Sequence, residues 1–203
     1  AEATYGHIST WVTSAVTDME ALFEDASSFN DDIGAWDVSG VTTMVDMFLG
    51  ASSFDRDIGE WRVESVTDMR YMFEDAFAFN RSIGNWDVSN VKDMYGMFDW
   101  AFAFNQPIGA WDTSGVTRLE EMFQGARSFN QSLNDWDISN VGDMSWMFEA
   151  AVSFNQPLNA WNLASVTMMD GMFKNATSFN QPLSAWSFPS VTSMHSMFRL
   201  AKS

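Results

Sequence analysis

Residues 33–54 read I-G-A-W-D-V-S-G-V-T-T-M-V-D-M-F-L-G-A-S-S-F, and close variants of this unit recur every 25 residues without insertion or deletion. Three columns keep one residue type in all eight copies: Trp at 11, 36, 61, 86, 111, 136, 161 and 186; Phe at 23, 48, 73, 98, 123, 148, 173 and 198; Ala at 26, 51, 76, 101, 126, 151, 176 and 201. A fixed period of this length is the signature of an architecture in which repeated units stack on their neighbours.

Two shorter periods are visible inside the unit. Trp36 and Val38 alternate with Asp37, which predicts a short strand with one buried face. Apolar residues then recur at spacings of three and four, which predicts a short helix. These residues are Val41, Met44, Met47, Phe48 and Ala51. We therefore expect an α/β repeat solenoid, leucine-rich-repeat-like, with eight 25-residue coils that each contain a short strand and a short helix.

The unbroken period favours a single solenoid domain over residues 1–203, with residues 1–10 as its N-terminal edge. The chain stops at Ser203, soon after Ala201, and we expect no C-terminal cap on the last coil. Because terminal repeats normally need a polar cap, we expect this coil to dock on another protein or to continue into a longer array.

Two further columns are expected to serve packing. The Met residues fill the middle of the coils, because their flexible side chains adapt to irregular gaps. A polar column at the corner of each coil is expected to bond backbone groups of its own and the next coil. Its members are Asn30, Asp55, Asn80, Asn105, Asn130, Asn155 and Asn180.

The full repeat pattern is F-N-Q-x-x-x-x-W-D-V-S-x-V-x-x-M-x-x-M-F-x-x-A-x-x-F, and it covers nearly the whole chain. The last unit, residues 186–201, reads W-S-F-P-S-V-T-S-M-H-S-M-F-R-L-A. These residues resemble the BspA-like leucine-rich repeats of bacterial and protist surface proteins, whose unit is I-x-I-P-x-S-V-x-x-I-x-x-x-A-F-x-x-C, with Ala201 in place of the Cys. The resemblance implies a horseshoe or rod solenoid that is not an enzyme, lies on a cell surface and serves adhesion or protein contacts.

The net charge of −17 at pH 7 disfavours nucleic acid and anionic membranes as partners, because both repel a polyanion. It favours solubility, cations or a basic protein partner. Residues 1–75 hold 16 of the 27 acidic residues and 3 of the 10 basic ones. This end is either a solvated end that keeps the chain soluble or a docking end for a basic partner or cations. The chain has no cysteine for a disulfide or thiolate site. No apolar run approaches the roughly 18 residues of a membrane span, so we expect a chain that does not cross a membrane.

An aromatic cluster replaces smaller residues near the middle of the chain. Phe77 and Phe102 occupy a column that otherwise holds Ser, Arg, Val or Thr, and Trp100 stands where the neighbouring coils have Asp or Gly. Successive coils would bring the two Phe rings side by side. We consider two interpretations: an exposed contact patch for a protein, lipid or pigment, or local packing of each ring on its own turn. The candidate contact residues are Phe77, Trp100, Phe102, Tyr71, Tyr95 and, apart from the others, Trp146.

The outward position of the predicted strand forms a mostly acidic stripe. Its members are Asp37, Arg62, Asp87, Asp112, Asp137, Asn162 and Ser187. Carboxylates about 5 Å apart along the stack would share a cation or receive Lys and Arg side chains from a partner. The alternative is that each Asp bonds the backbone at the end of its strand, or keeps an edge soluble.

A regular row of threonines on a rigid surface can match ice, so ice binding is an alternative function. The row comprises Thr17, Thr42, Thr67, Thr117, Thr167 and Thr192. Lys92 and Gly142 interrupt it, and capping of the predicted helices already explains Thr at this position.

No catalytic constellation is visible. His7 and His195 lie near opposite ends of the chain, there is no Cys nucleophile, and no phosphate-binding or metalloprotease motif occurs. We expect no enzyme activity, no cofactor and no metal site.

The expected function is a non-enzymatic protein-binding or scaffold module. Its contacts would use the aromatic cluster, the uncapped C-terminal coil or the acidic stripe. The alternatives are a free cell-surface or secreted adhesin and a peripheral subunit of a large membrane complex. We expect an extracellular or cell-surface location, with another exported compartment as the alternative.

Overall fold

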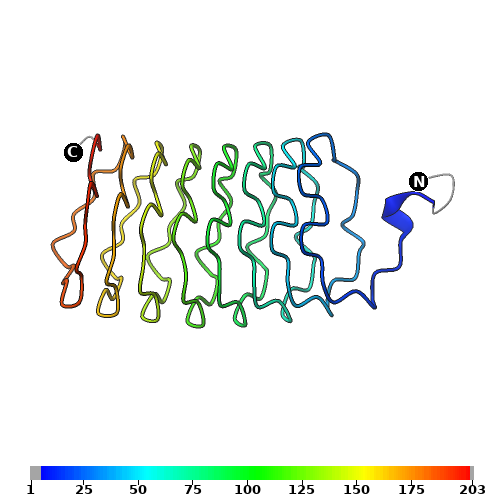
Figure 1. The fold of residues 1–203 in the computed structure, drawn as a ribbon, viewed down its shortest axis with the longest axis horizontal. Coiled ribbons are helices and arrows are strands. Elements are labelled where there is room, and N and C mark those ends of the chain that lie inside the picture. Colours follow the sequence, from blue (N-terminus) through cyan, green and yellow to red (C-terminus); the bar gives the residue numbers. More distant parts are fainter. Residues whose placement is uncertain (1–5, 202–203) are drawn as a thin grey trace.

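The computed structural model describes residues 6–201, which wind into a row of stacked coils with the two ends of the chain at opposite ends of the row (Figure 1). Successive coils are offset by 25 residues, and the side chain of Asn80, for example, bonds the backbone of Asn105. The helix η1, Ile8–Thr10, is a 3-10 helix within the predicted N-terminal edge. Residues 1–5 of that edge, and residues 202–203 at the other end, lie outside the described range.

The predicted α/β repeat solenoid, with a strand and a helix in each coil, is wrong. Between Gly6 and Ala201 the chain has no β-strand, and its only helix is η1. Adjacent coils meet at isolated parallel bridges. The bridges join Asp18 to Thr43, Thr43 to Asp68, Asp68 to Asp93, Asp93 to Arg118, Asp143 to Met168, and Met168 to Ser193.

The segment that was predicted to be helical is a succession of turns. In the coil at 44–51, the N–H of Met47 donates to the carbonyl of Met44, three residues back, at 3.2 Å. The N–H groups between these turn bonds point out of the coil: those of Asp46 and Phe48 donate to carbonyls of the next coil, both at 3.0 Å. Within residues 44–51, half of the backbone N–H groups therefore donate to the next coil. An α-helix would use these donors within the same segment.

Two left-handed residues in each coil make this geometry possible. In the same coil they are Asp46, with φ 55°, and Gly50, with φ 67°. The equivalent positions are left-handed in the other described coils: Ala21, Tyr71, Gly96, Glu121, Trp146, Gly171 and Ser196, and Asp25, Asp75, Trp100, Gly125, Ala150, Asn175 and Leu200. Left-handed residues do not continue a right-handed helix, so the apolar spacing of three and four belongs here to a chain of turns.

The segment that was predicted to be a strand has the expected burial but not the expected hydrogen bonds. Trp36 and Val38 are buried and Asp37 is exposed. The N–H of Trp36 donates to the carbonyl of Ile33 at 3.0 Å, which closes a turn. The indole joins the coils in place of a ladder. From Trp36 to Trp186, the Nε1–H of each Trp in this column donates to a backbone carbonyl 28 residues earlier at 2.8–3.2 Å. The pairs are Trp36–Ile8, Trp61–Ile33, Trp86–Ile58, Trp111–Ile83, Trp136–Ile108, Trp161–Leu133 and Trp186–Leu158.

Aromatic and Met side chains fill the interior of the stack. Phe48 stacks on Phe54 of its own coil at 4.1 Å between ring centroids and on Phe73 of the next coil at 5.4 Å. Met44 and Met47 are fully buried, as predicted for the Met columns. The predicted bond from the polar column to the next coil is confirmed: Asn80 Oδ1 accepts the N–H of Asn105 at 3.0 Å, and the same bond recurs along the column.

Candidate interaction face

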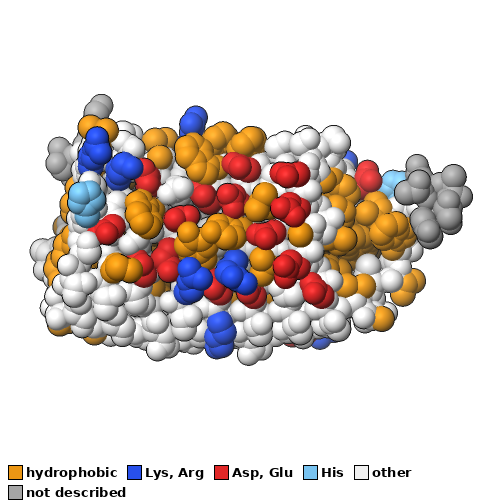
Figure 2. All heavy atoms as spheres, in the orientation of Figure 1, with side chains coloured by type: hydrophobic (Ala, Val, Ile, Leu, Met, Phe, Trp, Pro, Cys, Tyr) orange, Lys and Arg blue, Asp and Glu red, His pale blue; other side chains and the backbone are white. Residues whose placement is uncertain are grey.

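One side of the stack carries the outward side chains of the turn segments. We call it the turn face, and define it by positions 18, 20, 21, 24, 25 and 27 of the first coil with their equivalents every 25 residues. Figure 2 shows this face, on which acidic side chains gather toward the N-terminal half, with basic and apolar side chains among them. All the predicted aromatic contact residues lie on it, whereas the acidic stripe does not.

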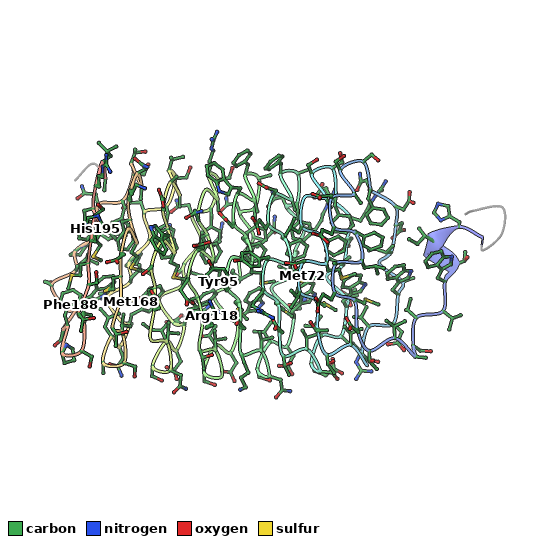
Figure 3. The ribbon with its side chains drawn as sticks, in the orientation of Figure 1. Met72, Tyr95, Arg118, Met168, Phe188 and His195 are labelled. Carbon is green, nitrogen blue, oxygen red and sulfur yellow. The ribbon has the colours of Figure 1, made fainter. Side chains whose placement is uncertain are left out.

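Tyr95 and Arg118 lie near the centre of the turn face (Figure 3), and Tyr71 packs against Tyr95. The two tyrosine rings meet edge to face at 4.8 Å and 88°. The guanidinium of Arg118 sits over the Tyr95 ring at 4.6 Å from its centroid. Arg118 also pairs with Asp93 and with Glu120, both at 3.2 Å. Burial raises the pKa of both tyrosines, so both hydroxyls are neutral.

The structure brings the second group of predicted residues together as well. The rings of Phe77 and Phe102 stack at 4.7 Å and 9°, as the sequence predicts for neighbouring coils. Trp100 meets Phe102 edge to face at 5.8 Å, and the guanidinium of Arg127 covers Phe102 at 4.4 Å. Phe77 is 40% exposed and Trp100 is 36% exposed, so these rings pack locally and also reach solvent.

The large rings at left-handed positions lie over glycines of the next coil. A Cβ added to Gly96 would lie 2.5 Å from the Tyr71 ring, one added to Gly125 would lie 2.8 Å from Trp100, and one added to Gly171 would lie 2.5 Å from Trp146. This pairing is readable in the sequence as an aromatic residue followed by glycine 25 residues later. It places Trp146 on the same face as the cluster.

An acidic cluster that sequence analysis missed lies beside Trp100. It comprises Glu74, Asp75, Asp99 and Glu121. Asp99 is only 5% exposed; its Oδ2 accepts a long hydrogen bond from Gln124 at 3.4 Å, and its Oδ1 is buried without a partner among residues 6–201. Burial, and then the charges of Glu74, Glu121 and Asp75, raise the pKa of Asp99 to about 8. Burial, and then Asp75, raises the pKa of Glu74 to about 7.

The acidic stripe is exposed, but its side chains are bonded locally. Asp37 Oδ1 accepts the N–H of Ser39 at 3.1 Å and its hydroxyl at 2.6 Å. These two hydrogen bonds lower the pKa of Asp37. Ser89, Ser114 and Ser139 donate their N–H groups in the same way to Asp87, Asp112 and Asp137, and Arg62 pairs with Glu64. The backbone-bonding interpretation of the stripe therefore matches the geometry.

The threonine row is bonded between coils and caps no helix. Thr42 Oγ1 donates to the carbonyl of Thr17 at 3.1 Å, and Thr192 Oγ1 donates to that of Thr167 at 3.1 Å. The capping explanation is wrong because the predicted helices do not form. These hydroxyl protons are directed at protein carbonyls, which weakens the ice-binding alternative.

The last described coil exposes apolar side chains. Phe198 and Leu200 are exposed, and Phe198 borders a hollow with Phe179 and Leu183. Among residues 6–201 no three His, Asp and Glu side chains form a group that could hold a metal ion. No helix in that range has the length and apolar character needed to cross a membrane.

The sequence matches the family described as "Mycoplasma protein of unknown function, DUF285", once over residues 1–110 and again over residues 94–203. The chain belongs to this family. Two overlapping matches are expected when one repeat pattern runs through the whole chain. No curated protein and no solved structure matches the chain. The family description assigns no role to any residue, so the geometry of the turn face carries the functional argument.

Proposed function

We propose that the chain is a non-enzymatic protein-binding module of a cell-surface or secreted protein, and that the turn face carries its contacts. The single observation behind this proposal is the half-exposed aromatic group Phe77, Trp100 and Phe102. Exposed aromatic rings with polar neighbours are typical of the central residues of protein interfaces. The resemblance to BspA-like surface repeats supports the same role and location.

The backbone under the turn face supports a binding role. The N–H of Trp100 donates to the Gln124 carbonyl of the next coil at 2.7 Å, and the N–H of Phe77 donates to the Asp75 carbonyl at 2.9 Å, so the backbone at both ring-bearing positions is held by hydrogen bonds. A side chain held in place before binding loses less conformational entropy when a partner docks. The outward residues also differ from coil to coil, whereas the buried columns are constant. Selection for packing alone does not require this variety.

The test compares the wild-type chain with the triple variant Phe77→Ser, Trp100→Gly, Phe102→Ser. These replacements occur at equivalent positions of this chain, at Ser27 or Ser52 and at Gly50 or Gly125, so the stack should stay folded. Both proteins are immobilised and exposed to a panel of purified extracellular and cell-surface proteins. We expect a partner that binds the wild type and loses at least about tenfold in affinity for the triple variant, since interface aromatics each contribute about 2 kcal/mol or more.

The matched control is Phe188→Val, which removes an exposed ring outside the turn face and introduces the residue found at Val38, Val63 and Val88. This variant should bind like the wild type. If a partner binds the wild type, the triple variant and Phe188→Val equally well, the turn face is not the binding surface and the proposal fails.

A further inference from the structure

The chain's own arginines show how the turn face holds a guanidinium. Arg118 lies over the Tyr95 ring and pairs with Asp93 and Glu120. Arg127 lies over the Phe102 ring. In both cases the arginine comes from the coil after the ring. A guanidinium is flat, stacks on aromatic faces and donates in its plane to carboxylates. The face therefore already binds arginine twice within the molecule.

Trp100 has similar surroundings but no arginine of its own. The coil after it offers Gln124 and Gly125 at the two nearest positions of the face, and no guanidinium within residues 6–201 lies over the Trp100 ring. Tryptophan is the strongest of the aromatic residues in cation–π contacts. The exposed part of the Trp100 ring is therefore a cation-binding surface that no arginine of residues 6–201 occupies.

The carboxyl groups beside Trp100 have no cationic partner. Asp75 precedes Trp100 in the same column, and its N–H donates to the Asp99 carbonyl at 2.9 Å. Glu74 and Asp99 occupy equivalent positions of neighbouring coils, and the charges of Glu74 and Asp75 both raise the pKa of Asp99. Within the described chain, none of the three takes part in an ion pair. By contrast, Asp93 on the same face pairs with both Arg70 and Arg118.

Asp99 supplies an independent observation. Asp99 is 5% exposed, yet its Oδ1 receives no hydrogen bond from the rest of residues 6–201. A buried acceptor without a donor is unfavourable and is rare in folded proteins. A guanidinium, with five N–H donors, would provide the missing bond when it stacks beside Trp100.

We infer that Trp100, Glu74, Asp75 and Asp99 form a binding site, which we call the arginine seat, for an arginine side chain of a basic polypeptide partner. The inference rests on the proposed function and names the chemistry of the partner. The net charge of −17 supports a basic partner, because the field of the whole chain attracts it. Arginine is favoured over lysine because only its planar group stacks on the indole and donates to carboxylates in the same plane.

Proton release is a consequence that an ordinary surface ion pair would not share. The charged and polar groups around Asp99 are Glu74 and Asp75 from the preceding coil, and Glu121 and Gln124 from the next. Burial, and then the charges of Glu74, Glu121 and Asp75, raise the pKa of Asp99 to about 8 and keep it protonated near neutral pH, whereas the hydrogen bond from Gln124 lowers this pKa. A bound guanidinium favours the carboxylate, so binding should release a proton near pH 7 and strengthen as pH rises toward about 8.

The experiment measures binding of an arginine–glycine peptide and of a lysine–glycine peptide of equal length to the full chain. Titration calorimetry near pH 7, in two buffers with different ionisation enthalpies, gives both affinity and proton release. We expect the arginine peptide to bind about three- to tenfold more tightly, as cation–π contacts of partly exposed rings allow, and to release protons. Trp100→Gly should abolish the preference for arginine, and Asp99→Asn should reduce the proton release. Phe188→Val should change neither.

Equal affinity for the two peptides, unchanged by Trp100→Gly, would overturn the inference. Failure of the arginine seat is distinguishable from failure of protein binding. If a panel protein loses affinity for the triple variant while the peptides show no arginine preference, the turn face binds proteins by other chemistry and only the seat is wrong. If the seat is correct, an identified partner should lose affinity for Trp100→Gly and when its docking arginines are changed to lysine.

Discussion

Two sides of each coil differ in how much their residues vary and in whether their polar groups have hydrogen-bond partners. On the first side, which we call the Trp–Asp corner (residues 36–39 and their equivalents), the coils are much alike. The indole bonds the preceding coil. In four coils the Asp accepts the backbone N–H of the Ser two residues later, and Asn162 accepts that of Ala164 in the same way. On the turn face, the residues change from coil to coil, and Asp46, Asp99 and Glu120 each bury a carboxyl oxygen that has no partner among residues 6–201. Constant residues with satisfied polar groups hold the stack together. The variable residues, some with unsatisfied polar groups, form the surface on which we propose that a ligand binds.

The largest expected loss of stability comes from a substitution in the Trp–Asp corner. Trp111 is 4% exposed, and its Nε1–H donates to the Ile83 carbonyl at 3.1 Å. Trp111→Ala should lower the free energy of unfolding by about 3–5 kcal/mol, because it opens a cavity between coils. Trp111→Phe should cost about 1–2 kcal/mol, since it mainly removes the indole donor. Urea unfolding followed by circular dichroism measures both.

The matched change on the turn face is Trp146→Gly, which introduces the residue found at Gly96 and Gly171. Trp146 is 40% exposed, so this variant should lose less than about 1 kcal/mol. Equal losses for Trp111→Ala and Trp146→Gly would show that the two sides do not differ in their contribution to stability.

The sequence predicted the inward faces of the coils but not their backbone. Met44, Met47, Phe48 and Ala51 are fully buried, as the spacing of three and four requires. An α-helix and a chain of turns with periodic left-handed residues both bury this spacing, so it does not distinguish them. The distinguishing signal was Gly, Asp or Asn at many of the left-handed positions, since these residues adopt positive φ most readily. Trp100 and Trp146 at the same positions hid that signal.

The second prediction compares two glycines, Gly171 on the turn face and Gly142 outside it. Gly171 has φ 60°, and a Cβ there would meet the Trp146 ring at 2.5 Å, whereas a Cβ on Gly142 would meet nothing within 4 Å. Gly171→Ala should therefore cost about 2 kcal/mol through backbone strain and displacement of the ring. Gly142→Ala should be neutral or stabilise by up to about 1 kcal/mol through the unfolded chain. Thermal unfolding and Trp fluorescence report the two effects. An unchanged melting temperature for Gly171→Ala would contradict the tight contact.

The candidate site was predictable only in part. The stacking of Phe77 on Phe102 follows directly from their 25-residue separation. The acidic cluster was not predicted, because the burial of Asp99 depends on the turn geometry and on the bulk of neighbouring side chains. Counting charges along the chain does not separate Asp99 from Asp37, yet burial raises the pKa of one and hydrogen bonds lower that of the other.

The smallest expected effect is a gain in stability that depends on pH. Folding raises the pKa of Asp99 to about 8 from its ordinary value of 3.8. A raised acidic pKa contributes stability that is fully present below the unfolded value and is lost as pH rises through the folded value. Asp99→Asn removes this loss. The variant should unfold like the wild type near pH 4 and be more stable by at least about 1 kcal/mol near pH 8, since the buried oxygen no longer becomes charged.

The difference between variant and wild type isolates Asp99, because the other carboxyl groups titrate in both proteins. Asp37→Asn is the control with the opposite sign: the pKa of Asp37 is lowered, so its loss should not stabilise the chain at higher pH. Paired urea titrations across this pH range measure both differences. If Asp99→Asn gains no stability toward pH 8, the carboxyl group is solvated or paired in the folded chain, and the contrast between a satisfied corner and an unsatisfied turn face would not hold at this residue.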